Sequence, residues 1–159
     1  MAIEMRSEYE ILSLTEAHLA DVAELERLCF SEPWSEKSLR MLTETGAVGF
    51  VAQSDGLVVA YAGMTTVLDE GAVTNIATHP DARRQGLGRA VTNALLTYAS
   101  AHGIRSVFLE VRESNEAAIR LYESLGFSPC GIRKNFYRQP TESAIQMVWT
   151  DGTTEETKP

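Results

Sequence analysis

Cysteine and histidine are scarce in this chain. Its 159 residues include two cysteines and three histidines. Cys29 and Cys130 form neither a C-x-x-C pair nor a metal-ligand spacing, and the histidines are scattered. This pattern argues against a structural zinc site and against a disulfide framework, so we expect no metal. We predict two reduced thiols, buried or half-buried, because free cysteine behaves as a small apolar residue.

The chain also lacks a long apolar run. No stretch approaches the roughly 20 consecutive apolar residues that a membrane-spanning helix needs. The first ten residues, MAIEMRSEYE, carry charges on both sides of their few apolar residues, unlike the apolar centre of a secretory signal. We therefore expect a cytoplasmic protein with no membrane partner.

Basic residues are fewer than acidic ones. Lys and Arg number 14 against 22 Asp and Glu, which gives a formal net charge of −8. Nucleic acid is a poor partner for such a surface, because phosphate binding needs clustered basic side chains. An acidic surface attracts cationic peptides, but the same charge can serve solubility alone. We expect a monomer or weak dimer that binds no nucleic acid.

What the chain does contain is an alternation of helical and strand patterns. With 44% apolar residues it can build one core. Thr15 and Ser35 are placed to cap the first two helices, and residues 54–56 (Ser-Asp-Gly) indicate a hairpin turn. Hydrophobic periodicity predicts helices over 14–30 and 31–42, within 81–103 and over 115–125, and strands within 49–68 (two) and over 72–80, 106–111, 130–138 and 143–149. We divide the chain into an N-terminal extension (1–9), one mixed α/β domain (10–150) and a disordered acidic tail (151–159).

A glycine-rich segment, RRQGLGRA (residues 83–90), lies between a predicted strand and a predicted helix. Gly86 and Gly88 leave the first amides of the helix uncovered. Those N–H groups, the positive helix end and the neighbouring arginines suit a pyrophosphate. Neither the P-loop nor the Rossmann fingerprint fits, because Gly88 is followed by Arg-Ala and the position for a third glycine holds Val91. Taken alone, the loop could equally be a tight turn with solvated arginines.

The order of motifs is more specific than the loop. RRQGLGRA has the form R/Q-x-x-G-x-G/A, follows the strand TNIAT, and precedes LEVRESNEAAIRLYESLGF (residues 109–127). In that order these segments resemble the GNAT superfamily of acetyl-CoA-dependent N-acetyltransferases over roughly residues 10–150. The resemblance implies the GNAT fold, a single α/β domain whose central, mixed and mostly antiparallel sheet is flanked by helices.

Four segments resemble, more narrowly, the bacterial enzymes that acetylate the N-terminal alanine of the small-subunit ribosomal protein numbered eighteen. They are CFSEPWSEKSL, VLDEGAVTNIATHPDARRQGLGRA, LEVRESNEAAIRLYESLGF and GIRKNFYR. The resemblance implies acetyl-CoA as cosubstrate and the basic N-terminus of a ribosomal protein as acceptor. It implies contacts to acetyl-CoA from Ile76, Ala77, Thr78, Arg83, Arg84, Gln85, Gly86, Leu87, Gly88, Arg89 and Asn115. His79 and Thr78 depart from the family pattern, and Asn115 is equally a good helix N-cap.

Acetyl transfer needs a neutral amine, a stabilised carbonyl oxyanion and a proton for the departing thiolate. Glu110 ends an otherwise apolar strand, and the resemblance assigns it as the general base of a direct attack. It assigns Tyr122 as the general acid, and a backbone N–H of the strand 74–78 could meet the oxyanion. Two alternatives stay open: Glu110 could pair with Arg112 or a nearby lysine, and Tyr122 could be a core aromatic.

On the acceptor side, Trp34 and Phe30 could line a peptide-binding wall, and Tyr137 resembles a substrate-side tyrosine of the family. The alternatives are core aromatics that anchor the first helices and, for Tyr137, a cross-strand aromatic pair. The enzyme could also act on another amine, such as a polyamine, an antibiotic or a lysine. A non-catalytic CoA-binding regulator is a further possibility, although a pure binder needs neither Glu110 nor Tyr122.

Overall fold

The computed structural model describes residues 8–152. The predictions for residues 1–7 and for the tail residues 153–159 lie outside the described residues. Contacts divide the domain into two compact units. We call Met1–Thr65 with Thr74–Leu95 the first unit, and Thr66–Val73 with Leu96–Pro159 the second unit.

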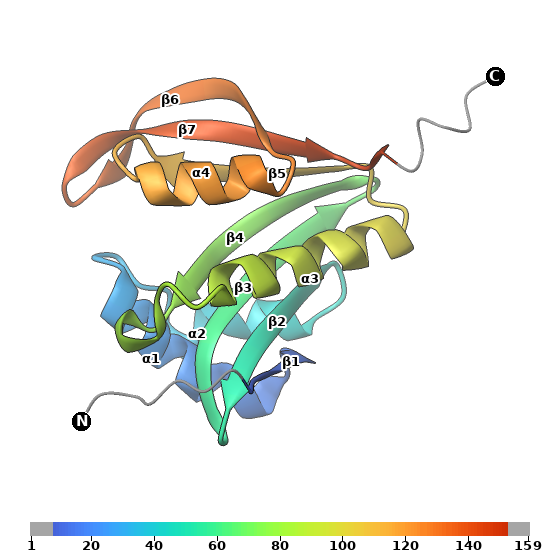
Figure 1. Cartoon of the computed structure of the whole chain (residues 1–159), viewed down its shortest axis with the longest axis vertical. Coiled ribbons are helices and arrows are strands. Elements are labelled where there is room, and N and C mark those ends of the chain that lie inside the picture. Colours follow the sequence, from blue (N-terminus) through green and yellow to red (C-terminus); the bar gives the residue numbers. More distant parts are fainter. Residues whose placement is uncertain (1–7, 153–159) are drawn as a thin grey trace. The chain divides into compact units, whose positions relative to one another are not determined.

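The secondary structure combines strands and helices (Figure 1). In chain order the elements are β1 (Glu10–Ser13), η1 (Glu16–His18), α1 (Leu19–Cys29), α2 (Glu36–Leu39), η2 (Arg40–Thr43), β2 (Ala47–Ser54), β3 (Leu57–Val67), β4 (Glu70–Thr78), η3 (Pro80–Ala82), α3 (Leu87–Ala101), β5 (Ser106–Arg112), α4 (Glu116–Ser124), β6 (Ser128–Arg138) and β7 (Thr141–Thr150). The strand order is β1-β2-β3-β4-β5-β7-β6. The β4–β5 pair is parallel, whereas β1–β2, β2–β3, β5–β7 and β6–β7 are antiparallel, which confirms the mixed, mostly antiparallel sheet.

The sequence pattern predicts every one of these strands except β1. This strand has four residues and pairs with β2 from Glu10↔Gln53 to Ser13↔Phe50. Four residues carry too little alternation to be recognised from sequence. The hairpin between β2 and β3 is confirmed, because Asp55 and Gly56 both have the positive φ, 50° and 80°, that a two-residue turn of this kind requires.

The two predicted helix caps are found with one change. Ser35 Oγ accepts a hydrogen bond from Ser38 N at 3.1 Å and begins α2 as predicted. Thr15 caps the short 3-10 helix η1 rather than α1, in a capping box with His18. The chain thus turns once in 3-10 geometry before α1 begins at Leu19.

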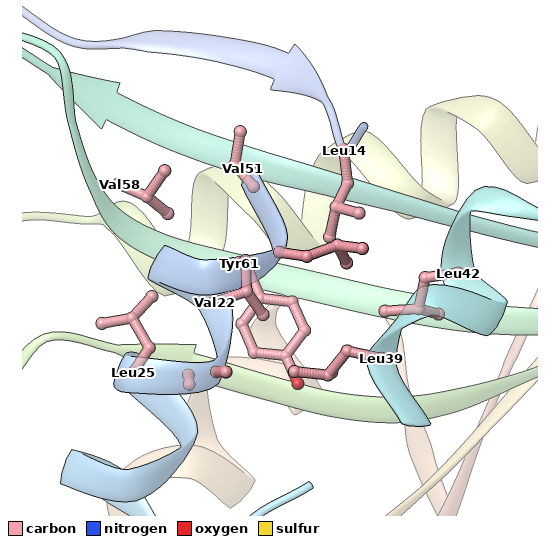
Figure 2. Close-up of a cluster of buried hydrophobic side chains, with 11 residues drawn as sticks. Leu14, Val22, Leu25, Leu39, Leu42, Val51, Val58 and Tyr61 are labelled. Atoms are coloured by element: carbon pink, nitrogen blue, oxygen red, sulfur yellow. The ribbon is translucent and has the colours of Figure 1, made fainter. Parts of the chain in front are cut away.

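The core of the first unit lies between α1, α2 and the strands β2 and β3. Its apolar cluster comprises Leu14, Leu19, Val22, Ala23, Leu25, Leu39, Leu42, Val51, Val58, Tyr61 and Ala77. Figure 2 shows the ring of Tyr61 among Val22, Leu25 and Leu39. Strand β3 is buried from Val58 to Met64 without alternation, which indicates that both of its faces are covered. Figure 1 shows α1 and α2 behind the strands and the N-terminal part of α3 in front of them.

The second unit is organised around β5 and β7, which pair along their length from Ser106↔Thr150 to Arg112↔Ala144. Strand β6 ends the strand order and is exposed at nearly every position. Asp151, the first residue of the predicted tail, is only 5% exposed. Its Oδ1 accepts a hydrogen bond from Ser100 Oγ at 3.3 Å, and its N–H donates to the Arg105 carbonyl at 2.8 Å.

The two cysteines are free thiols, as predicted. Cys29 is half-buried, but Cys130 is exposed, so the predicted burial of Cys130 is wrong. The physical reason is its position on β6, where side chains on both faces reach solvent. Among residues 8–152, no helix is long and apolar enough to span a bilayer.

Candidate active site

The glycine loop of the first unit has the backbone that an anion site requires. Arg84 and Gly86 both have positive φ, 68° and 77°, just before α3 begins at Leu87. Ala90 N donates to Gly86 O at 3.0 Å as the helix starts. The amides of Leu87 and Gly88 stand ahead of that bond and have no helical carbonyl to bind. These observations fit the pyrophosphate of acetyl-CoA at the N-terminus of α3.

The end of β4 leads directly into this loop. Ala77 is 4% exposed, whereas Ile76 and Thr78 are half-buried. The Thr78 carbonyl accepts a hydrogen bond from Cys29 Sγ at 3.3 Å, and Cys29 Sγ in turn accepts one from Arg83 Nη2 at 3.7 Å. Burial raises the pKa of the Cys29 thiol, although Arg83 acts in the opposite direction.

His79 has a local structural role that suits its departure from the family pattern. Its Nδ1 accepts a hydrogen bond from Asp81 N at 3.1 Å and so caps the 3-10 helix η3. An aspartate or glutamate can accept the same bond. The departure therefore preserves the turn between β4 and the glycine loop.

Strand β5 explains the carboxylate in an apolar strand. Its burial alternates, with Val107, Leu109 and Val111 buried on one face and Phe108, Glu110 and Arg112 half-buried on the other. Glu110 therefore does not enter the core of the second unit. Its side chain is 24% exposed, which keeps the carboxylate partly in contact with solvent.

The alternative that Glu110 pairs with Arg112 is wrong. The basic group near Glu110 is Arg133, whose Nε lies 3.9 Å from Glu110 Oε1, with the Arg133 side chain 54% exposed. A long, solvated pair of this kind contributes little to stability. The role of Glu110 as general base stays a prediction.

Tyr122 and Tyr137 of the second unit interact electrostatically. Tyr122 is 9% exposed and meets Phe127 edge to face at 5.9 Å, so its ring also fills core space, as the alternative supposed. Burial, and secondly Tyr137, raise the pKa of Tyr122 to about 12. Burial likewise raises the pKa of Tyr137 to about 12, with Arg112 opposing and Glu110 and Glu142 adding to the shift. Tyr137 thus interacts electrostatically with both proposed catalytic groups.

Arg112 has a role that sequence analysis missed. Its guanidinium carbon lies 4.3 Å from the centroid of the Tyr137 ring, and its Nη1 donates to the Pro140 carbonyl at 3.0 Å and to Glu142 Oε1 at 3.3 Å. Glu142 Oε2 accepts a hydrogen bond from Ser114 N at 2.5 Å. Hydrogen bonds from Ser114 and Arg112 hold the pKa of Glu142 below its usual value. Tyr137 therefore stacks on a cation instead of forming the cross-strand aromatic pair; its aromatic neighbour is Phe136, at 5.0 Å.

Asn115 is confirmed as a helix cap. Its Oδ1 accepts a hydrogen bond from Ala118 N at 3.2 Å at the start of α4. The side chain is exposed, so a second role toward acetyl-CoA stays compatible with this geometry. The contact itself stays a prediction.

In the first unit, Phe30 and Trp34 are half-buried and pack against the apolar cluster. The core alternative therefore accounts for part of each ring. A second missed residue lies beside them: Glu26 is fully buried and accepts a hydrogen bond from Trp34 N at 2.9 Å. The available signal was a carboxylate on the apolar face of α1, at the spacing 19, 22, 26, 29.

In the part of the chain that the structure describes, no group of three or more His, Cys, Asp or Glu side chains could hold a metal ion. The described groups are instead a helix N-terminus suited to phosphate in the first unit, and a carboxylate with two tyrosines in the second. Carboxylates and tyrosines are among the side chains that can act as general bases and general acids, and the roles predicted for Glu110 and Tyr122 stay predictions.

Comparison with known proteins identifies the family of the chain. Residues 19–127 match the acetyltransferase (GNAT) family. The chain is 41% identical over 142 residues to the ribosomal protein bS18-alanine N-acetyltransferase of Escherichia coli K12, covering 87% of this chain and 95% of that protein. It is 32% identical over 145 residues to a putative enzyme of the same name from Bacillus subtilis, covering 90% and 96%.

Solved structures show the same fold. The crystal structure of the ribosomal-protein-S18-alanine N-acetyltransferase from Escherichia coli superposes with a TM-score of 0.84 at 39% identity, covering 90% of this chain and 94% of that chain. Ard1 from Thermoplasma volcanium, at 24% identity, shares the fold with a TM-score of 0.81, covering 89% and 97%. The extent of the family match and the identity to the curated relatives show that this chain belongs to the acetyltransferase (GNAT) family.

Proposed function

We propose that the chain transfers the acetyl group of acetyl-CoA, the cosubstrate of its family, to the α-amino group of the N-terminal alanine of ribosomal protein bS18. The observation that carries this proposal is the 41% identity to an enzyme named for that reaction, over 95% of its length. A ribosomal acceptor would place the enzyme in the cytoplasm.

The first unit supplies the groups that hold the cosubstrate. The amides at the start of α3 and the arginines of the loop 83–89 would bind the pyrophosphate. Backbone groups of Ile76, Ala77 and Thr78 would bind the acetyl and pantetheine end, and the family resemblance assigns Asn115 a contact to acetyl-CoA.

The second unit supplies the proton transfers. The amine nitrogen attacks the thioester carbonyl, so that a C–N bond forms and the C–S bond breaks. Glu110 takes the proton that the amine loses, directly or through water. Tyr122 donates a hydrogen bond to the departing sulfur, because its pKa of about 12 keeps it protonated at neutral pH. The thiolate then takes its proton from water.

The acceptor amine is chosen partly by its acidity. An α-amino group has a pKa of about 7.7–8.0 and a lysine side chain of about 10.4, so at pH 7 roughly one α-amine in ten is neutral, against well under one lysine in a thousand. A partly solvated carboxylate such as Glu110 therefore serves α-amines most easily. The net charge of −8 favours encounter with a basic N-terminus.

The test measures release of free CoA thiol from acetyl-CoA with a panel of acceptors. The panel holds an alanine-starting peptide with the sequence of the bS18 N-terminus, the same peptide with its N-terminus already acetylated, a lysine-containing peptide, a polyamine and an aminoglycoside. We expect turnover with the first peptide alone. Turnover on free polyamines or lysine alone would overturn the proposal, and CoA binding without any turnover would favour a regulator.

A further inference from the structure

Glu26 is a fully buried carboxylate that the proposed reaction does not use. It is 0% exposed and belongs to the buried face of α1, together with Leu19, Val22 and Leu25. Burying a carboxylate is costly, and an apolar side chain of similar volume often serves stability as well or better. The role of Glu26 should therefore be sought in the groups that it binds.

Three donors from three different segments converge on this carboxylate. Tyr61 on β3 donates its hydroxyl to Oε2. Asn75 on β4 donates from Nδ2 to Oε2 at 2.9 Å and to Oε1 at 3.3 Å. The backbone N–H of Trp34, in the segment between α1 and α2, donates to Oε1 at 2.9 Å. Burial and the Glu26 charge both raise the pKa of Tyr61, so Tyr61 remains a donor at neutral pH.

Two of the donors to Glu26 lie at or beside segments of the first unit that are predicted to bind the two substrates. Trp34 belongs to the segment predicted to line the acceptor peptide. Asn75 directly precedes Ile76, at the strand end predicted to bind the acetyl group. One turn after Glu26, Cys29 makes a second connection from α1 to the end of β4 through the Thr78 carbonyl.

We infer that Glu26 is a positioning residue that ties the backbone of Trp34 to β3 and β4 and thereby holds the wall that the acceptor peptide contacts. This inference rests on the proposed function. We expect the tie to affect binding of the acceptor peptide, because Trp34 is the one of the three donors that belongs to the predicted peptide-binding segment. The expected signature is a change in the KM of the peptide that leaves the KM of acetyl-CoA nearly unchanged.

Two substitutions distinguish loss of the hydrogen bond to Trp34 N from the effect of altering a buried carboxylate. Glu26→Asp withdraws the carboxylate by about 1.5 Å, the length of one carbon–carbon bond, so Trp34 N loses its acceptor. Glu26→Gln keeps one oxygen for Trp34 N, while the Tyr61 hydroxyl and the Asn75 amide can turn to accept from its new NH₂. Glu24→Asp, on the exposed face of the same helix and paired with Arg27, is the matched control.

With the bS18 peptide, we expect Glu26→Asp to raise the peptide KM by at least about fivefold, the equivalent of losing part of one charged hydrogen bond. The KM of acetyl-CoA should change less than about twofold, and Glu26→Gln and Glu24→Asp should stay within about threefold of wild type for both substrates. If Glu26 acts through Trp34, Glu26→Asp should raise the peptide KM no further in a Trp34→Ala background. An equal increase in both backgrounds, or an unchanged peptide KM, would overturn the inference.

A fluorescence measurement checks the tie without substrate. The chain has two tryptophans, so Trp149→Phe leaves Trp34 as the sole reporter. We expect Glu26→Asp to increase quenching of Trp34 by acrylamide, and Glu26→Gln to leave quenching unchanged. Equal quenching in all three proteins would overturn the inference even if turnover is found. Failure of wild type to acetylate any peptide would instead overturn the proposed function, and with it the acceptor role of the tie.

Discussion

Replacing Tyr122 with phenylalanine removes one hydroxyl from the second unit and leaves the ring in place. That ring is 9% exposed and packs edge to face on Phe127, and phenylalanine can keep both features. The free energy of unfolding should therefore change by about 1.5 kcal/mol or less, the scale of one hydrogen bond. A much larger effect on turnover would be an effect on the chemistry.

The size of that effect depends on whether Tyr122 releases its proton or only shares it. Its pKa is about 12, whereas a thiol has a pKa of about 8.5. Full transfer to the thiolate is then uphill by about 3.5 units, or about 5 kcal/mol at 1.36 kcal/mol per unit. This cost favours a hydrogen bond to the charge that develops on sulfur. Loss of such a donor typically lowers kcat about 100- to 1,000-fold, and we expect that range for Tyr122→Phe.

Thiol release with the bS18 peptide measures this change, with Tyr98→Phe as the matched control. Tyr98 stacks on His102 at 3.9 Å and has no role in the proposed reaction, so its variant should retain wild-type kcat. A Tyr122→Phe enzyme that keeps more than about a third of wild-type kcat would refute the reasoning, because a donor of this kind is worth far more. So would a phenolate that titrates below about pH 10 in wild type and is missing from Tyr122→Phe, since burial should hold that proton longer.

Two further predictions concern stability and cosubstrate binding. Because the pKa of Tyr122 is about 12 when folded and about 10 when unfolded, its stabilising effect is complete below about pH 10 and is lost as pH rises through 12. Between about pH 10 and 12 the free energy of unfolding of wild type, measured with denaturant, should fall by up to about 2.7 kcal/mol more than that of Tyr122→Phe. If the two free energies change with pH in parallel, the raised pKa of Tyr122 is wrong. Gly86→Ala should raise the KM of acetyl-CoA, because alanine disfavours the positive φ of +77° on which the shape of the loop depends. An added Cβ meets nothing within 4 Å, so the cost comes from backbone conformation alone and is about 1–2 kcal/mol. Gly56→Ala, with φ +80° and the same open surroundings, should lose similar stability yet keep the KM of acetyl-CoA, and an equal rise in both variants would refute a cosubstrate role for the loop.

The local patterns of the sequence predict most of the fold. Helices and longer strands repeat their hydrophobic spacing often enough to be recognised, and the turn at residues 54–56 carries its own conformational signal. Strand β1 is too short for such a signal. The exposure of Cys130 depends on β6 lying at the end of the strand order, which hydrophobic spacing alone does not reveal.

The candidate site likewise contains residues that local sequence motifs predict and contacts that they do not. Sequence motifs select the glycine loop, Glu110 and Tyr122, because each lies in a contiguous segment with a family pattern. Partners distant in sequence are a different matter. Arg112 binds Glu142, thirty positions later, and Glu26 binds Asn75, forty-nine positions later. Only the folded chain decides these pairings, and so local pattern could not exclude the Glu110–Arg112 pair.

The alternation of β5 has a consequence for how such an enzyme can change over time. Val107, Leu109 and Val111 are constrained by packing, whereas Phe108, Glu110 and Arg112 occupy the other, half-buried face. Substitutions at 108 or 112 therefore leave the packed face of the strand unchanged. Position 108 can vary at little cost to the core, whereas a change at 112 also removes the hydrogen bonds to Pro140 and Glu142 and the cation beside Tyr137.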